Sequence, residues 1–348
     1  MRTLKPAGLV ALLLAAIAFP QVFSSPAVTT VAFFTLIFAA AATAWNIFSG
    51  YTGYIALGHA AYFGIGSYAM AIMCKDWGLQ GGYLPFLLLP LAGLVALIFA
   101  VPMGWIALRT RKHTFVVVTI AMFFVMQLMA YNLRGLTNGS IGMTLPIPSN
   151  WSGVFFNLPF YYVALALLLV ALGHSWWIRH SKYGLGLLAI RDDEERALGL
   201  GVNTGQFKLT AFVISAFYVG MIGALHAYYI ESLYPAFAFD PLFDLVVALM
   251  TFLGGLGTLA GPIIGALILE PTQQYFTMRF SQNGYYLIIY GVMFLAIILF
   301  LPEGILPTLR KRFAKAPPVS GPRSTADEQP ETVARETTTS SHLEGAQQ

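Results

Sequence analysis

The sequence has little charge and almost no cysteine. Only 10% of its 348 residues are charged, whereas a soluble domain carries about 25%. Hydrophobic residues make up 57% of the chain, and many lie in runs close to the ~20 residues that a helix needs to cross a bilayer. The single cysteine, Cys74, excludes an internal disulfide framework and a cysteine-rich metal site. The composition therefore predicts a membrane protein with many spans.

Sequence motifs of several enzyme classes are missing as well. The chain has no GxxxxGK[ST] phosphate loop, no HExxH, and no GxSxG placed between a strand and a helix. Its six histidines show no ligand spacing. The acidic residues nearest the apolar runs are Glu231, Asp240, Asp244 and Glu270, and they lie near the ends of those runs. We therefore expect no catalytic residue, no metal and no cofactor, and no nucleic-acid partner.

Hydropathy predicts an all-α membrane protein with about ten transmembrane helices. The expected spans are 7–23, 28–48, 54–73, 84–108, 114–131, 160–178, 209–230, 243–256, 261–277 and 285–301. The eighth span is short and ends in glycine, so a re-entrant or broken helix is an alternative there. Residues 1–306 form the expected transmembrane domain. Residues 307–348 form a tail that is first basic and then polar, and we expect its polar part to be disordered and cytoplasmic.

The distribution of lysine and arginine predicts the orientation. With the N-terminus inside, 16 of the 19 basic residues fall in cytoplasmic segments, and Lys75, Arg134 and Arg279 fall outside. Because cytoplasmic loops carry the excess of Lys and Arg, both termini are predicted to be cytoplasmic. We therefore expect membrane lipid to surround most of the chain.

Two glycine-rich segments interrupt the apolar runs. In the first, small residues at spacings of three or four would share one face of a helix: Gly53, Ala56, Ala60, Gly64, Ser67 and Ala71. Such a face predicts close helix packing in lipid, with the lining of a pathway as the alternative. His59 lies beside this face, and either a structural hydrogen bond or a role in a pathway is open. The second segment contains Gly254, Gly255, Gly257 and Gly261, which we also expect to serve helix packing or the translocation pathway.

The segment from Arg179 to Lys208 has nine charged residues in thirty. The acidic run 192–195 favours a helix start, because acids are stabilising near a helix N-terminus. Leu187, Ile190 and Ala197 lie near one face. We predict a short amphipathic helix on the cytoplasmic surface, with docking of a soluble partner as the functional interpretation. Charge that is merely solvated is the alternative.

Several motifs occur in the order that one transporter family shows. They are "GYTGYIALGHAAYFGIGSY" (50–68), "NGSIGM" (138–143), "SKYGLGLLAIRDDEERALGLGVN" (181–203), "FKLTAFVISAFYVGMIGALHAYY" (207–229), "LGGLGTLAGPIIGA" (253–266) and "LPEGI" (301–305). By these motifs together, the chain resembles the M-type permease subunits of the branched-chain amino-acid ABC transporter family. A departure from many members is Tyr54, where a glutamine is common.

The resemblance implies a permease of the bacterial inner (plasma) membrane that imports branched-chain or related amino acids by alternating access. It implies four kinds of contact: a second, related permease, two cytoplasmic ATPase subunits, a periplasmic substrate-binding protein, and lipid. The residues implied in ATPase coupling are Arg191, Asp192, Glu194, Glu195, Ala197 and Gly201; those implied in contact with the binding protein are Asn138, Gly139, Ser140 and Gly142. An ion-coupled secondary transporter or a channel for a small solute, such as urea or an amide, is the alternative function.

Overall fold

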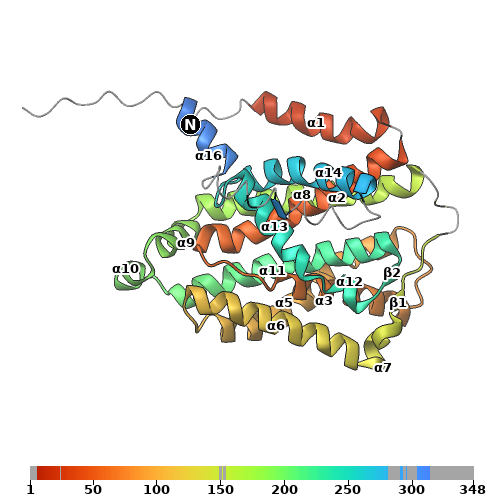
Figure 1. The fold of residues 1–348 in the computed structure, drawn as a ribbon, viewed down its shortest axis with the longest axis horizontal. Helices are drawn as coiled ribbons and strands as arrows, with labels where there is room; N and C mark the ends of the chain where they lie inside the picture. Colours follow the sequence, from red (N-terminus) through yellow and green to blue (C-terminus); the bar gives the residue numbers. More distant parts are fainter. Residues whose placement is uncertain are drawn as a thin grey trace, which may run out of the picture.

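The fold is a bundle of long helices that run roughly side by side (Figure 1). A computed structural model describes residues 6–23, 25–148, 151, 154–280, 291–292, 295 and 304–313. The all-α, multi-span prediction is confirmed, since six helical stretches in the described residues are long and apolar enough to cross a membrane: Pro26–Gly50, Leu84–Ala107, Lys112–Asn132, Phe156–His180, Thr204–Ile230 and Pro235–Gly254. The count of ten spans and the orientation stay predictions. Of the predicted span 285–301 only residues 291–292 and 295 are described, and the tail from residue 314 lies outside the described residues.

The first half of the chain forms helices α1 (Pro6–Val22), α2 (Pro26–Trp45), α3 (His59–Asp76), α4 (Leu84–Leu87), α5 (Leu89–Ala107), α6 (Lys112–Asn132) and α7 (Arg134–Thr137), with a π-helical turn η1 (Asn46–Gly50) and a 3-10 turn η2 (Gly139–Ile141). The second half forms α8 (Val154–His180), α9 (Lys182–Asp192), α10 (Glu194–Gly199), α11 (Thr204–Ile230), α12 (Pro235–Ala238), α13 (Pro241–Gly254), α14 (Gly261–Phe280) and α16 (Ile305–Phe313). Strands β1 (Met143–Thr144) and β2 (Ser232–Leu233) pair antiparallel. Helices α9 and α10 lie at one end of the bundle, and the strands and α7 lie at the other (Figure 1).

Helix α11 is the centre of the packing and contacts α2, α3, α5 and α8. The backbones of α11 and α3 are in direct contact. A Cβ added at Gly66 would lie 2.0 Å from the carbonyl oxygen of Gly220, and one added at Gly223 would lie 2.0 Å from that of Phe63. The Ser67 hydroxyl donates a hydrogen bond to the Gly223 carbonyl at 2.9 Å. Small residues thus bring these two helices together, as expected where lipid offers no hydrophobic drive for association.

The predicted helix over 54–73 is wrong at its start, because α3 begins only at His59. Residues 53–58 are not helical, and Gly53 has φ +73°, in the left-handed region that favours glycine. Gly53 and Ala56 therefore do not lie on the predicted helix face. The backbone of this segment is satisfied from α2 and η1, since Trp45 Nε1 donates to the Ala56 carbonyl at 2.8 Å and Ser49 Oγ accepts from the Ala56 N–H at 3.3 Å.

A second interruption separates α13 from α14. Helix α13 ends at Gly254, close to the predicted end of this span, and the chain is not helical again until Gly261. The 14 residues of α13 reach the length of a span only together with α12, as the stretch Pro235–Gly254. We call residues 53–58 the first break and residues 255–260 the second break. Irregular backbone of this kind is tolerated in a membrane protein only where protein or a water-filled cavity covers it.

Candidate functional site

The two breaks are joined through Asn46, a buried residue at the start of η1. Its Nδ2 donates to the Thr258 carbonyl at 2.9 Å, and its Oδ1 accepts from the Gly257 N–H at 2.8 Å. One side-chain amide therefore satisfies a donor and an acceptor of the second break. Because η1 leads into the first break, the Asn46 side chain connects the two breaks.

Two arginines from the α8–α9 region reach the same place. Arg191 Nη1 donates to the Gly50 carbonyl at 2.9 Å, and Arg179 Nη1 donates to the Gly257 carbonyl. Gly257 has φ +75°, and a Cβ there would lie 2.0 Å from Arg191 Nη1, so only glycine fits. We call Asn46, Arg179 and Arg191 the break clamp. Its arginines supply the cations and donors that unpaired carbonyl groups at the end of a helical stretch require.

A second connection joins α10 to the first break. Glu194 Oε1 accepts from Lys208 Nζ at 2.5 Å, and Glu194 Oε2 accepts from the Tyr54 hydroxyl at 2.5 Å. Lys208 Nζ also donates to the Tyr54 oxygen at 3.3 Å and lies 4.4 Å from the centre of the Tyr54 ring. Lys208 is 4% exposed, and the Glu194 carboxylate is its ion-pair partner. We call Tyr54, Glu194 and Lys208 the Glu194 network.

The Glu194 carboxyl is tuned by opposing effects. Burial raises its pKa, but hydrogen bonds from Lys208 and Tyr54 and the Lys208 charge lower it by more. The net result is a pKa below the ordinary value, so Glu194 is a carboxylate at neutral pH. The Glu194 network therefore contains a charged pair that joins α10 to Lys208, in the second turn of α11.

The predicted amphipathic segment is present but consists of two helices. Leu187, Ile190 and Ala197 are buried, as predicted. The single helix is wrong because Asp193 lies in an extended conformation. Its Oδ1 accepts from the N–H groups of Glu195 and Arg196 at 3.0 and 3.1 Å, which caps the start of α10. Asp193, which belongs to the acidic run predicted to start a helix, is thus the N-cap of α10.

The six residues predicted to contact an ATPase divide into two sets. Arg191 and Glu194 are held by partners within the chain, and Ala197 is buried. The others, Asp192, Glu195 and Gly201, are exposed. Sequence reasoning missed two exposed leucines beside them, Leu198 at 60% and Leu200 at 84% exposure. Their alternation with Gly199 and Gly201 could have indicated this exposure, because large apolar residues in a glycine-rich turn have few neighbours to pack against.

His59, the histidine of the glycine-rich segment, is hydrogen-bonded to α11, and its role stays a prediction. It is fully buried, and its Nε2 lies 2.8 Å from Ser215 Oγ on α11. The start of α3 is satisfied from α13, because Asp244 Oδ2 accepts from the Ala60 N–H at 3.1 Å. Of the other predicted packing residues, Gly64 faces the Phe239 ring, which would lie 2.5 Å from an added Cβ. Gly66, the closest contact to α11, was not among them.

The residues predicted to contact a binding protein form one turn at the other end of the bundle. Asn138 has φ 62°, and its Nδ2 donates to the Gly142 carbonyl at 2.9 Å. Gly139 and Gly142 are buried, and Ser140 is exposed beside Ile141, which is 78% exposed. The turn leads directly into β1 and so is fixed by the pairing with β2.

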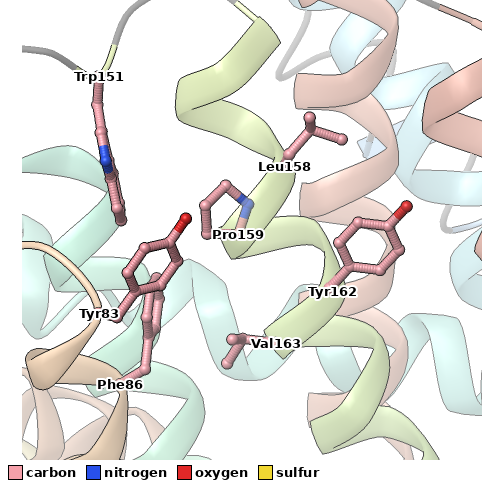
Figure 2. A pocket seen from close by; sticks show the side chains of 7 residues that line it. All are labelled: Tyr83, Phe86, Trp151, Leu158, Pro159, Tyr162 and Val163. Atoms are coloured by element: carbon pink, nitrogen blue, oxygen red, sulfur yellow. The ribbon is translucent and has the colours of Figure 1, made fainter.

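An aromatic cavity of about 610 Å³ opens near the start of α8. Figure 2 shows Tyr83, Phe86 and Trp151 on one side of it and the α8 residues Leu158, Pro159, Tyr162 and Val163 on the other. No charged side chain is among these residues, so this cavity suits apolar groups and offers no partner for the charges of a zwitterion.

Comparison with known proteins decides the family. Residues 27–298 match the model of the branched-chain amino acid transport system / permease component family. The chain belongs to this family. It is 29% identical over 87% of its length to the high-affinity branched-chain amino acid transport system permease protein LivM of Escherichia coli, of which it covers 75%. The LivM protein of Salmonella typhimurium gives the same figures.

A second type of permease is also similar. The high-affinity branched-chain amino acid transport system permease protein LivH of Salmonella typhimurium is 24% identical over 77% of this chain, and 91% of LivH is covered. The greater identity to LivM agrees with the predicted M type. No solved structure matches the chain.

Proposed function

We propose that this chain is one permease subunit of an ATP-driven ABC importer that moves branched-chain or related amino acids across the bacterial inner membrane. Family membership and the similarity to LivM and LivH support the transport class. The observation that carries the mechanism is the break clamp. Arg191 from the exposed α9–α10 region is hydrogen-bonded to the backbone at Gly50, next to the glycine break between α2 and α3.

The clamp provides a route by which ATP hydrolysis in partner subunits moves the transmembrane helices. A partner ATPase that pulls α9 and α10 would displace Arg191, and with it η1 and, through Asn46, the second break. The breaks are suited to act as hinges because a few residues at the ends of helices absorb large backbone changes. The ATPase shifts the balance between inward and outward openings only if it binds the two states with different affinity.

The docking surface for the ATPase is the outer side of α10 and the turn that follows. We assign to it the exposed residues Asp192, Glu195, Leu198, Leu200 and Gly201. Apolar side chains on a short helix fit the grooves that accept such helices in other assemblies. Arg191, Glu194 and Ala197 then act from behind this surface by holding α9 and α10 in place.

Two further partners complete the importer. A second, related permease pairs with this chain, in line with the two types of relatives, LivM and LivH. A periplasmic binding protein contacts the opposite end, at Asn138, Gly139, Ser140 and Gly142, where the turn into β1 presents Ser140 and Ile141. Both termini are cytoplasmic in this arrangement.

Uptake by the reconstituted complex tests the proposed function. The two permeases and the ATPases are placed in liposomes with ATP inside, and the binding protein and radiolabelled leucine are added outside. We expect uptake that requires ATP, the binding protein and an intact phosphate-loop lysine in the ATPase. Uptake driven by an imposed proton or sodium gradient without ATP would instead establish the secondary-transporter alternative.

A further inference from the structure

A cavity of about 330 Å³ lies between the end of α5 and the start of α11. It is on the same side of the bundle as α9 and α10, since α11 starts directly after them. Its walls include Trp105 in the last turn of α5 with Leu108 and Arg109 just after it, and Asn203 just before α11 with Gln206 and Leu209 in its first turns. None of the residues that line it is acidic. The Glu194 network and the break clamp use none of these side chains.

Arg109 supplies the charge of this cavity. Its guanidinium carbon lies 3.5 Å from the centre of the Trp105 ring, a stacking contact that orients the planar group. In the part of the chain that the structure describes, ion pairs join Arg196 to Asp193 and Lys208 to Glu194, and Arg109 takes part in neither. A stacked guanidinium whose N–H groups have no partner among the described residues matches the oxygens of a phosphate group.

The rest of the wall combines polar and apolar groups. Asn203 and Gln206 are exposed and polar, while Leu108 and Leu209 are half-buried and apolar. Trp105 is 55% exposed, and tryptophan is enriched where a membrane meets water. The cavity therefore offers a cation beside apolar groups at the end of α5, and amides beside a leucine at the start of α11.

We propose that this cavity binds the phosphate head group of an anionic phospholipid, with Arg109 on the phosphate oxygens and Trp105, Leu108 and Leu209 against the glycerol and the first carbons of the acyl chains. Basic pockets between transmembrane helices are a recognised way of binding anionic lipids. The bound lipid would hold α5 against the start of α11, one turn before Lys208 of the Glu194 network. The proposal does not depend on the solute or on ATP.

Native mass spectrometry of the purified, delipidated permease with added phosphatidylglycerol tests the site. We expect Arg109→Gln to lower the occupancy of the tightest-bound lipid about fivefold, as for the loss of one basic contact. Arg111→Gln is the matched control, because it removes the same charge two residues on and does not line the cavity. Equal losses in the two variants would overturn the proposal, since they would show attraction by net charge alone.

A second variant separates binding from folding. Gln206→Glu adds a carboxylate to the cavity wall in the first turn of α11, where acidic residues favour a helix. It should lower phosphatidylglycerol occupancy with no loss of thermal stability in detergent. Displacement of the lipid by inorganic phosphate would overturn the lipid assignment, as would equal binding of phosphatidylcholine.

Discussion

Arg191 and Gly50 are 141 residues apart in the sequence and share a hydrogen bond of 2.9 Å from the guanidinium to the carbonyl oxygen. The donor belongs to α9 at the end of the bundle, and the acceptor ends the π-helical turn in the membrane-spanning stretch. Since Asn46 of the same turn holds the second break, the exposed loop and both breaks form one connected unit. That connection is what a subunit moved by a partner needs.

Replacement of Arg191 by glutamine is expected to uncouple the importer. The variant loses a hydrogen bond from a charged group, so uptake of leucine should fall about tenfold while the ATPase subunits still hydrolyse ATP. The measurement is the ratio of leucine taken up to ATP hydrolysed in liposomes. Arg196→Gln is the control, because its side chain is 86% exposed and pairs only with Asp193 among the described ion pairs. A normal ratio in Arg191→Gln would contradict the role of the clamp.

Replacement of Gly66 by alanine is expected to destabilise the bundle. The added Cβ would lie 2.0 Å from the Gly220 carbonyl oxygen, and backbone on both sides leaves no side chain to move away. Overpacking of this kind costs about 1–3 kcal/mol, seen as a lower thermal midpoint in detergent. Gly173→Ala in α8 is the matched control, since no atom lies within 4 Å of its added Cβ. The control should be neutral or stabilised by up to about 1 kcal/mol.

The Glu194 network should make stability depend on pH. Hydrogen bonds from Lys208 and Tyr54 hold the pKa of the Glu194 carboxyl below its ordinary value of 4.5, in spite of the burial that raises it. Because the folded pKa is the lower one, the contribution is present above about pH 4.5 and is lost as pH falls through the folded pKa.

The thermal midpoint of wild type and of Glu194→Gln, measured from pH 7 down to pH 3, checks this dependence. The difference between them should be largest at neutral pH and shrink below the ordinary carboxyl pKa of about 4.5. Glu195→Gln, at the exposed neighbouring position, should follow the wild-type curve throughout. A difference between wild type and Glu194→Gln that stays constant with pH would mean that the ion pair contributes nothing.

Periodicity predicted the loop in part and the break poorly. Leu187, Ile190 and Ala197 are buried, but their spacing indicated one continuous helix, which Asp193 interrupts. The small residues of the first break also fit helical spacing, so their pattern could not reveal that Gly53 takes φ +73°. The segment that follows is held at Ala56, which accepts from Trp45 Nε1 and donates its N–H to Ser49 Oγ, contacts that only the folded chain makes.

The sequence alone allowed a different interpretation of two polar residues of the site, Asn46 and Lys208. Asn46 is an amide within an apolar run, and a polar residue inside a span is by default a sign of function. Lys208 was grouped with the solvated charge of the loop, yet it lies in α11 and is buried beside Glu194. Charge counts place a segment on one side of a membrane, but they do not tell which lysine turns inward to meet a carboxylate.

The exposed leucines at the end of α10 should decide the binding of the ATPase. Leu200 is 84% exposed, and a large apolar side chain at the centre of a contact can contribute about 2 kcal/mol or more. Leu200→Ser should therefore reduce co-purification of the ATPase with the permease pair at least about tenfold.

Leu136→Ser is the control for this change, since Leu136 is 53% exposed on α7 at the opposite end of the bundle. Loss of the ATPase from both variants would point to a general defect of assembly. Full retention in Leu200→Ser, together with loss in a variant of Asp192 and Glu195, would assign docking to charge. The proposed apolar contact instead requires loss of the ATPase in Leu200→Ser and its retention in the variant of Asp192 and Glu195. Solvated surface charges contribute little to binding on their own.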